Sequence, residues 1–166
     1  ENQKSNEKIE ETKDQPGVEI RKREPSAAEF MEHLLSLVSP GDPNKKFGNF
    51  KKIGQGASGV VVTAIDQITG EEVAIKKMKL ASQPKKELIL NEIIIMSQYR
   101  HQNIVNYLDS FYINEELWVV MEYLDAGALT DIVVDACLDE PQMSAVSTQV
   151  YEGYILLDYS RVELFT

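Results

Sequence analysis

The chain has 166 residues, of which 43% are hydrophobic and 27% charged, as in ordinary soluble globular proteins. The single cysteine, Cys137, excludes a disulfide framework, and the presence of only two histidines argues against a structural zinc site. No apolar run approaches the roughly 20 residues that a membrane-spanning helix requires. The polar residues 1–14 do not resemble a secretory signal. We therefore expect a cytoplasmic protein without a membrane span.

The net charge of −10 is distributed unevenly along the chain. Residues 1–108 carry a net charge of +1, whereas residues 109–166 carry −11. A chain this acidic lacks the positive surface that nucleic-acid binding requires, so we expect no nucleic-acid partner. The nearly neutral first part is still compatible with a phosphate-binding site.

The chain begins with a charged segment that precedes a helical pattern. Residues 1–25 hold few apolar side chains and cannot offset their ordering entropy by burial, which predicts a disordered charged linker. An amphipathic helix and turn are expected over residues 26–46. Ser26 and Glu29 have the spacing of a capping box, and a Pro-Gly-Asp-Pro run ends the helix. The apolar stripe of this helix consists of Phe30, Leu34 and Val38.

From Phe47 onward the pattern changes to strands rich in β-branched residues. A helix that Pro84 opens interrupts them and ends at residues 101–103. Strands are predicted over residues 50–53, 60–65, 72–76, 104–112 and 117–124, turns over 67–70 and 114–116, and short helices over 129–136 and 140–150. The sum is an α+β fold in which a five-stranded antiparallel sheet carries one packed helix.

Three glycines, Gly54, Gly56 and Gly59, have the spacing Gly-x-Gly-x-x-Gly. The same spacing occurs in dinucleotide-binding proteins, where a helix must follow the third glycine. Here residues 60–62 are all valine, which favours a strand and makes the glycines the tip of a hairpin. Without side chains, the backbone amides of such a tip can approach phosphates closely. A flexible turn without a ligand is the alternative reading of the glycines alone.

Lys76 and Glu92 are the two charged residues that favour a phosphate-binding role for the hairpin. Lys76 ends the strand after the hairpin and can point at phosphates beneath it, although most lysines are simply solvated. Glu92 falls on the predicted apolar stripe of the next helix, where a carboxylate is costly unless it is paired. Lys76 is its expected partner, and removing one member of a buried pair should cost about 3–5 kcal/mol. The alternative is a different helix phase that leaves Glu92 in water. The predicted stripe consists of Leu88, Glu92, Ile95, Met96 and Tyr99.

Together these residues resemble the small lobe of a protein kinase. Gly54–Val61 matches the glycine-rich loop, Val73–Lys76 the strand that carries the lysine, and Glu92 the helix glutamate. Met121 stands at the gatekeeper position and Glu122–Leu124 at the hinge. The closer resemblance is to the PAK family of GTPase-activated serine/threonine kinases. The runs that carry it are Val38–Pro43, Ile53–Gly59, Gln83–Leu88, Asn103–Ser110 and Glu116–Leu124.

The resemblance implies an ATP site and a role for each of its residues. Apolar side chains would cover the adenine ring, the backbone of Glu122 and Leu124 would bind its edge, and Lys76, oriented by Glu92, would bind the α- and β-phosphates. Met96 and Tyr107 match the small-lobe half of the regulatory spine. The implied ATP-binding residues are Ile53, Gly54, Gln55, Gly56, Ala57, Ser58, Gly59, Val61, Ala74, Lys76, Glu92, Met121, Glu122 and Leu124.

The sequence also departs from the kinase pattern. It contains no His-Arg-Asp, Asp-Phe-Gly or Ala-Pro-Glu motif, so the catalytic aspartate and the usual magnesium ligand are missing. We expect this chain alone to be a truncated, catalytically inactive kinase that binds ATP weakly if at all. Magnesium and Rac-type small GTPases are expected only for the full-length family. The alternatives are a non-catalytic interaction or decoy module and a by-product without a selected role.

The predicted organisation therefore has five parts. After the linker (1–25) and the helix with its turn (26–46) come the kinase small lobe and hinge, residues 47–124. The start of the large lobe occupies residues 125–150, and the resemblance fades in a divergent tail, residues 151–166. Because one lobe would be largely missing, we expect exposed apolar lobe surface and self-association through it.

Overall fold

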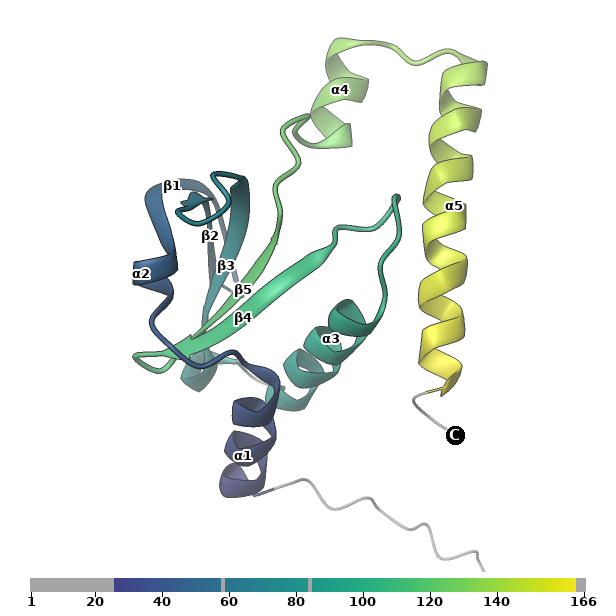
Figure 1. Ribbon diagram of the computed structural model, residues 1–166. Helices are drawn as coiled ribbons and strands as arrows, with labels where there is room; N and C mark the ends of the chain where they lie inside the picture. Colours follow the sequence, from purple (N-terminus) through teal and green to yellow (C-terminus); the bar gives the residue numbers. More distant parts are fainter. Residues whose placement is uncertain (1–25, 58, 84, 164–166) are drawn as a thin grey trace, which may run out of the picture.

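The computed structural model describes residues 26–57, 59–83 and 85–163 (Figure 1). The predicted linker, Ser58, Pro84 and the last three residues lie outside the described residues. The elements are α1 (Ala27–Leu37), α2 (Pro43–Lys46), β1 (Phe47–Gly56), β2 (Gly59–Asp66), β3 (Glu72–Lys79), the 3₁₀ turn η1 (Leu80–Ser82), α3 (Lys86–Gln98), β4 (Tyr107–Ile113), β5 (Glu116–Glu122), α4 (Leu129–Asp135) and α5 (Glu140–Glu163).

The five strands form one antiparallel sheet, as predicted, and its strand order is β1-β2-β3-β5-β4. Asp66 organises the β2–β3 turn, because its carboxylate accepts hydrogen bonds from the N–H groups of Ile68 at 2.8 Å and Thr69 at 3.3 Å. The β4–β5 turn contains only Asn114 and Glu115, both at positive φ, which is typical of a two-residue hairpin turn. The predicted third residue of this turn instead begins β5.

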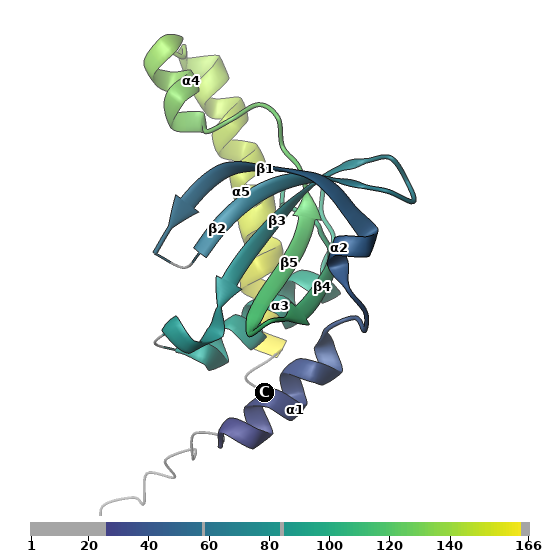
Figure 2. The same cartoon turned by 90° about the vertical axis from the view of Figure 1, so that its left-hand side faces the viewer.

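Each face of the sheet carries its own apolar cluster, because side chains alternate along a strand. One face packs against α1 and α3, and Figures 1 and 2 show both helices on this side. The buried residues of this cluster are Phe30, Leu34, Met78, Leu80, Ile89, Leu90, Ile93, Leu117 and Val119. The cluster on the opposite face consists of Phe47, Val62, Ala64, Val73, Ile75, Phe111, Trp118 and Val120.

The sheet is curved, so residues of non-neighbouring strands meet on this opposite face. The Lys77 ammonium on β3 lies 3.5 Å from the ring centroid of Trp118 on β5 and 4.3 Å from that of Phe50 on β1. Partial burial lowers the pKa of Lys77, and nearby Glu116 opposes this shift. Cation–π contacts of this kind favour the charged amine. One lysine thereby connects three strands.

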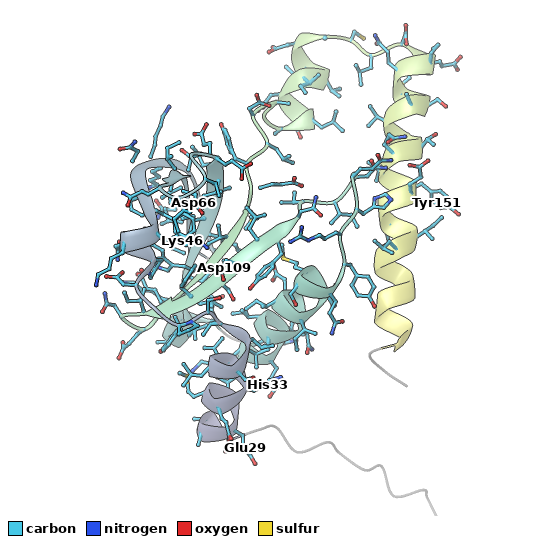
Figure 3. The ribbon with its side chains drawn as sticks, in the orientation of Figure 1. Glu29, His33, Lys46, Asp66, Asp109 and Tyr151 are labelled. Carbon is cyan, nitrogen blue, oxygen red and sulfur yellow. The ribbon has the colours of Figure 1, made fainter. Side chains whose placement is uncertain are left out.

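The two edge strands are also connected to each other. Lys46, at the end of α2 and directly before β1, forms a 2.9 Å ion pair with Asp109 on β4 (Figure 3). The Lys46 ammonium also lies 5.3 Å and 5.7 Å from the ring centroids of Phe47 and Phe111. The pair is partly shielded from solvent and links the residue directly before β1 to β4.

The predicted capping box of α1 is present. The Ser26 hydroxyl accepts from the Glu29 N–H at 3.3 Å, and the Glu29 carboxylate accepts from the Ser26 N–H at 2.6 Å. Phe30 and Leu34 are buried as expected, and Val38 is half-buried. α1 is therefore amphipathic and packs through the stripe that the sequence predicts.

The predicted apolar stripe of α3 is wrong. α3 buries Ile89, Leu90 and Ile93, whereas Leu88 is 58% exposed. Apolar residues occupy nearly every direction around this helix, so their spacing does not fix which side faces the core. The helix also ends at Gln98, before the predicted residues 101–103, and β4 begins three residues later than predicted.

α5 is longer than the helix predicted over residues 140–150 and continues through Val150 to Glu163. It stands beside the connection between α3 and β4, as both views show (Figures 1 and 2). The amide of Asn103 in this connection donates to the Gln149 carbonyl and the Glu152 carboxylate, each at 3.0 Å. Gly153 is buried at this contact. The approach is so close that a Cβ on Gly153 would lie 3.1 Å from the Asn103 carbonyl oxygen. In the described part of the chain, no helix combines the length and hydropathy of a membrane span.

Candidate nucleotide-binding site

The three glycines form the tip of the β1–β2 hairpin. Gly54 pairs with Val61 and Gly56 with Gly59. A strand, and not a helix, follows the third glycine, which excludes the dinucleotide-binding reading of the motif. Gln55 lies within the paired part of β1, and Ala57 lies in the turn next to Ser58, which is outside the described residues.

Gly59 and Gly56 have different structural roles in this tip. Gly59 has φ +149°, and a Cβ there would collide with the backbone carbonyl of Lys77. Gly59 is therefore required for the close approach of β2 to β3. A Cβ at Gly56 would meet no atom within 4 Å, so its backbone is open toward solvent. An uncovered backbone of this kind fits the approach of a phosphate group.

The strand register places the predicted side chains on one face. Val61 pairs with Lys76 across β2 and β3. Ala74 pairs with Met121 across β3 and β5. Because directly paired residues of neighbouring strands share a face, these four residues lie on the side that α3 covers. The result is an apolar surface with one ammonium group at its end.

Lys76 meets Glu92 of α3, with 3.3 Å between the ammonium nitrogen and a carboxylate oxygen. The structure thus brings together the pair that the sequence suggests. The side chains are 25% and 52% exposed, however, so the expectation of a buried pair is wrong. The rotated phase of α3 is the reason, since it turns Glu92 toward water. Exposed pairs contribute about 0–1 kcal/mol to stability, so this contact serves position more than stability.

Met121 and Glu122 end β5, and the next residues lead to an exposed Leu124. The N–H of Glu122 donates to the Asn106 carbonyl at 3.0 Å. Its carboxylate accepts from the Asn106 N–H at 2.7 Å and from the Asn106 amide at 2.9 Å. Since the N–H is engaged, a ligand at this position would be met by the Glu122 carbonyl. Ile53, on β1, is also exposed.

Comparison with known proteins decides the meaning of this arrangement. The protein kinase domain model matches residues 47–161. The chain belongs to the protein kinase domain family. The match continues past Val150, so the family resemblance does not fade there as the sequence suggests. The match includes most of α5, the helix for which the sequence predicts too short a length.

The relatives of this kinase chain confirm the resemblance to the PAK family. It is 53% identical over 146 residues to the mouse serine/threonine-protein kinase PAK 1, covering 87% of this chain and 27% of the relative. It is 48% identical over 146 residues to the Caenorhabditis elegans serine/threonine-protein kinase pak-1, covering 86% and 26%. It is 49% identical over 133 residues to the Emericella nidulans serine/threonine-protein kinase ste20, covering 80% and 16%. The kinase chain thus spans about a quarter of these relatives or less.

The sequence did not single out Asn106, whose hydrogen bonds hold Glu122 at the end of β5. The connection before β4 is built from further polar contacts. The His101 N–H donates to the Asn106 side-chain oxygen at 3.3 Å, and the Asn103 N–H donates to the His101 imidazole at 3.2 Å. In the sequence, this site could have been found from the Asn and His residues that are concentrated in this short connection, because their side chains readily form hydrogen bonds with nearby backbone groups.

Two hollows lie close to the kinase lobe, but neither contains Lys76 or the hinge. One of about 360 Å³ lies beside the glycine hairpin on the face opposite to Lys76, and one of about 620 Å³ lies between α1 and α3. The smaller is lined by Gln55, Gly56, Ala57, Gly59, Val60, Lys77, Lys79, Ser82 and Glu116. Neither hollow is therefore the candidate site, and the exposed side chains of Ile53, Glu92 and Leu124 indicate an open surface rather than the enclosed cleft that binding sites usually have.

The candidate site offers no ready-made metal centre in the part of the chain that the structure describes. The parts of the chain that the structure describes contain no group of three or more His, Cys, Asp or Glu that could hold a metal ion. We therefore assign no step to a metal.

Met96 and Tyr107 are both half-buried; Tyr107 pairs with Met121 in the sheet. Burial raises the pKa of the Tyr107 phenol, against the hydrogen bond that it makes with Ser110.

Proposed function

We propose that this chain is the ATP-binding small lobe of a PAK-type serine/threonine kinase and that it transfers no phosphate by itself. The observation that carries the proposal is the Lys76–Glu92 contact of 3.3 Å on the sheet face that the glycine hairpin borders. An ammonium that a carboxylate orients is suited to bind phosphate oxygens. Because the chain belongs to the protein kinase domain family, ATP is the expected source of these phosphate oxygens.

The apolar and polar groups divide the binding of ATP between them. Adenine would lie against Ile53, Val61 and Ala74, and its edge would meet the backbone of Glu122 and Leu124. The phosphates would lie under the hairpin, against its amides and against Lys76. Affinity should be low, because the surface has one wall and leaves much of a ligand in water.

Phosphoryl transfer needs groups that this chain does not supply. Its sequence has no His-Arg-Asp or Asp-Phe-Gly motif. Phosphoryl transfer depends on positioning and on charge stabilisation, so a bound nucleotide would stay intact here. Phosphorylation of protein serine or threonine with magnesium, binding of Rac-type small GTPases and cytoplasmic signalling are proposed only for full-length members of the family.

An ATP titration followed by thermal unfolding tests this proposal. ATP should raise the unfolding midpoint of the wild type and of Lys79→Met, which removes an exposed lysine from the same strand. It should not raise that of Lys76→Met. No shift in the wild type, or equal shifts in all three proteins, would refute nucleotide binding at this site. Lys76-dependent phosphorylation of a basic protein with magnesium would refute the predicted inactivity.

A second candidate function is a non-catalytic interaction module, which the apolar surface of α4 and α5 favours. Exposed apolar side chains gather on these two helices, and such patches mark association sites. They are Leu129, Ile132, Val133, Val134, Met143, Val150, Tyr151, Tyr154 and Ile155. Sedimentation of the wild type should show self-association that Tyr151→Glu/Tyr154→Glu reduces. A compact monomer that binds no hydrophobic dye would contradict this function.

A further inference from the structure

α1 lies before the residues that the kinase family model matches, yet it shares a core with them. The family match begins at residue 47, whereas α1 ends at Leu37. Phe30 and Leu34 of α1 nevertheless belong to the same buried cluster as the core-facing residues of α3. A segment outside the matched domain thus covers the helix that carries Glu92.

One end of α1 is fixed to the sheet. Directly after the helix, the Ser39 N–H donates to the Ser110 carbonyl at 2.8 Å. Ser110 lies in β4 and is fully buried. This hydrogen bond therefore holds the C-terminal end of α1 against β4, and the capping box stabilises the N-terminal end of the helix.

α3 depends on its neighbours for its position. Lys85 stands at its N-cap but makes no side-chain capping hydrogen bond, so the helix start is not fixed from within. Ile89 and Ile93 are buried in the cluster that includes Leu34. Glu92 directly precedes Ile93, so any shift or rotation of this turn moves the carboxylate away from Lys76.

The contact between α1 and α3 is narrow. A cavity of about 620 Å³ opens beside it, bordered by Phe30 and Met31 of α1 and by Lys86 and Leu88 of α3. Side chains next to a cavity lack packing partners on one side, so they restrain a neighbour weakly. The restraint on α3 therefore rests most on Leu34, which is 0% exposed and does not border the cavity, with Phe30, 6% exposed, packed in the same buried cluster.

We propose that α1 is a positioning element: Phe30 and Leu34 hold α3 at the place where Glu92 reaches Lys76. The role in ATP binding rests on the function proposed above, whereas the positioning of the pair does not. Neither residue touches the nucleotide surface, and both act through α3. Truncating them should separate the pair without removing either charge.

Carbodiimide cross-linking of the full chain measures this pair directly. The reagent joins a carboxylate and an amine in contact as an amide, and mass spectrometry quantifies the Lys76–Glu92 product. We expect the yield to fall at least about threefold in Leu34→Ala and Phe30→Ala, the scale of coupling between residues that share a core. Glu92→Gln should give no product. Leu34→Met, which nearly keeps the side-chain volume, should restore the yield.

Val120→Ala is the matched control, because it truncates a buried residue of the cluster on the opposite face of the sheet. It should lower stability and leave the cross-link unchanged. Unchanged yields in the α1 variants, or an equal loss in Val120→Ala, would refute the positioning role. The milder Leu34→Val provides the same comparison where the alanine variant does not fold.

ATP affinity supplies the second readout. Leu34→Ala should weaken ATP binding at least about threefold in the wild type and have no further effect in Glu92→Gln, because both changes remove the same contact. Additive effects would show that α1 does not act through Glu92. If the wild type fails to bind ATP, the proposed function fails, and the cross-linking result still decides the role of α1.

Discussion

The sheet with α1 and α3 buries its apolar side chains, whereas α4 and α5 expose theirs. Both faces of the sheet carry apolar clusters. In the described side chains of α4 and α5, by contrast, Gly153 is the one buried residue. The first region therefore contains its own core and should fold independently. The second holds its position through a few contacts with the connection before β4, and its apolar surface is suited to a further partner.

Alanine substitutions should separate the two regions most strongly. Ile75→Ala removes a fully buried side chain from the sheet, and Val134→Ala removes one that is 80% exposed on α4. The first should lower the free energy of unfolding by about 2–5 kcal/mol. The second should change it by less than about 0.5 kcal/mol. Urea unfolding measures both, and comparable losses would argue that α4 shares the core of the sheet.

Two glycines at positive φ provide the next contrast. Gly59→Ala would force a Cβ onto the Lys77 carbonyl, and we expect a loss of about 1–3 kcal/mol. Gly127, before α4, has φ +76° and open space around it. Gly127→Ala should therefore strain only the local backbone and leave the urea midpoint of the sheet unchanged. A larger effect at Gly127 than at Gly59 would reverse our ranking of the regions.

Gly153→Leu should detach α5 from the kinase lobe, because even a Cβ would lie 3.2 Å from the Ile104 side chain. Hydrogen exchange should then accelerate in α5 and in the connection before β4, while the sheet stays protected. Ser147→Leu, on an exposed position of α5, is the control and should leave exchange unchanged. Loss of protection throughout the sheet would mean that the two regions fold as one unit.

Glu92→Gln should have a small effect on stability, within about 1 kcal/mol, because the ion pair is exposed. Its effect on ATP binding should be the larger one. A stability loss of several kcal/mol, measured by urea unfolding, would show that the pair is buried after all.

The capping box should give the smallest effect and a defined pH dependence. Hydrogen bonds from Ser26 lower the pKa of Glu29 below its ordinary value of 4.5. The cap therefore stabilises fully above this value, and its contribution is lost as the pH falls through the folded-state pKa. The unfolding midpoint of the wild type should approach that of Glu29→Gln between about pH 5 and about pH 3. A constant difference across this range would contradict the assignment.

The sequence was sufficient where composition or a polar face marks an element, and insufficient where neither does. The strands were predictable as β-branched runs between turn residues and α1 as an amphipathic helix, although the ends of β1 and β4 differ from those predicted. α3 carries Leu88, Leu90, Ile94 and Ile95 on different sides, so only the packing of α1 and the sheet selects its buried face. The full length of α5 was missed because its apolar residues have no clear helical period.

The candidate site was predictable in its residue types but not in its exposure. The glycines, Lys76 and Glu92 follow from spacing and from family resemblance. The register that aligns Val61 with Lys76 depends on pairing between strands, which one strand alone does not specify. The bond between Asn106 and Glu122 joins residues 16 positions apart and becomes visible only in three dimensions.

Trp118 is the single tryptophan of the chain, and it lies buried beneath the Lys77 ammonium. Its emission therefore reports the state of the curved strands alone. Unwinding of α4 or α5 will leave the tryptophan emission unchanged, whereas circular dichroism will register the loss of helix. Tryptophan fluorescence and circular dichroism recorded over the same denaturation can thus assign each transition to one of the two regions without any labelling.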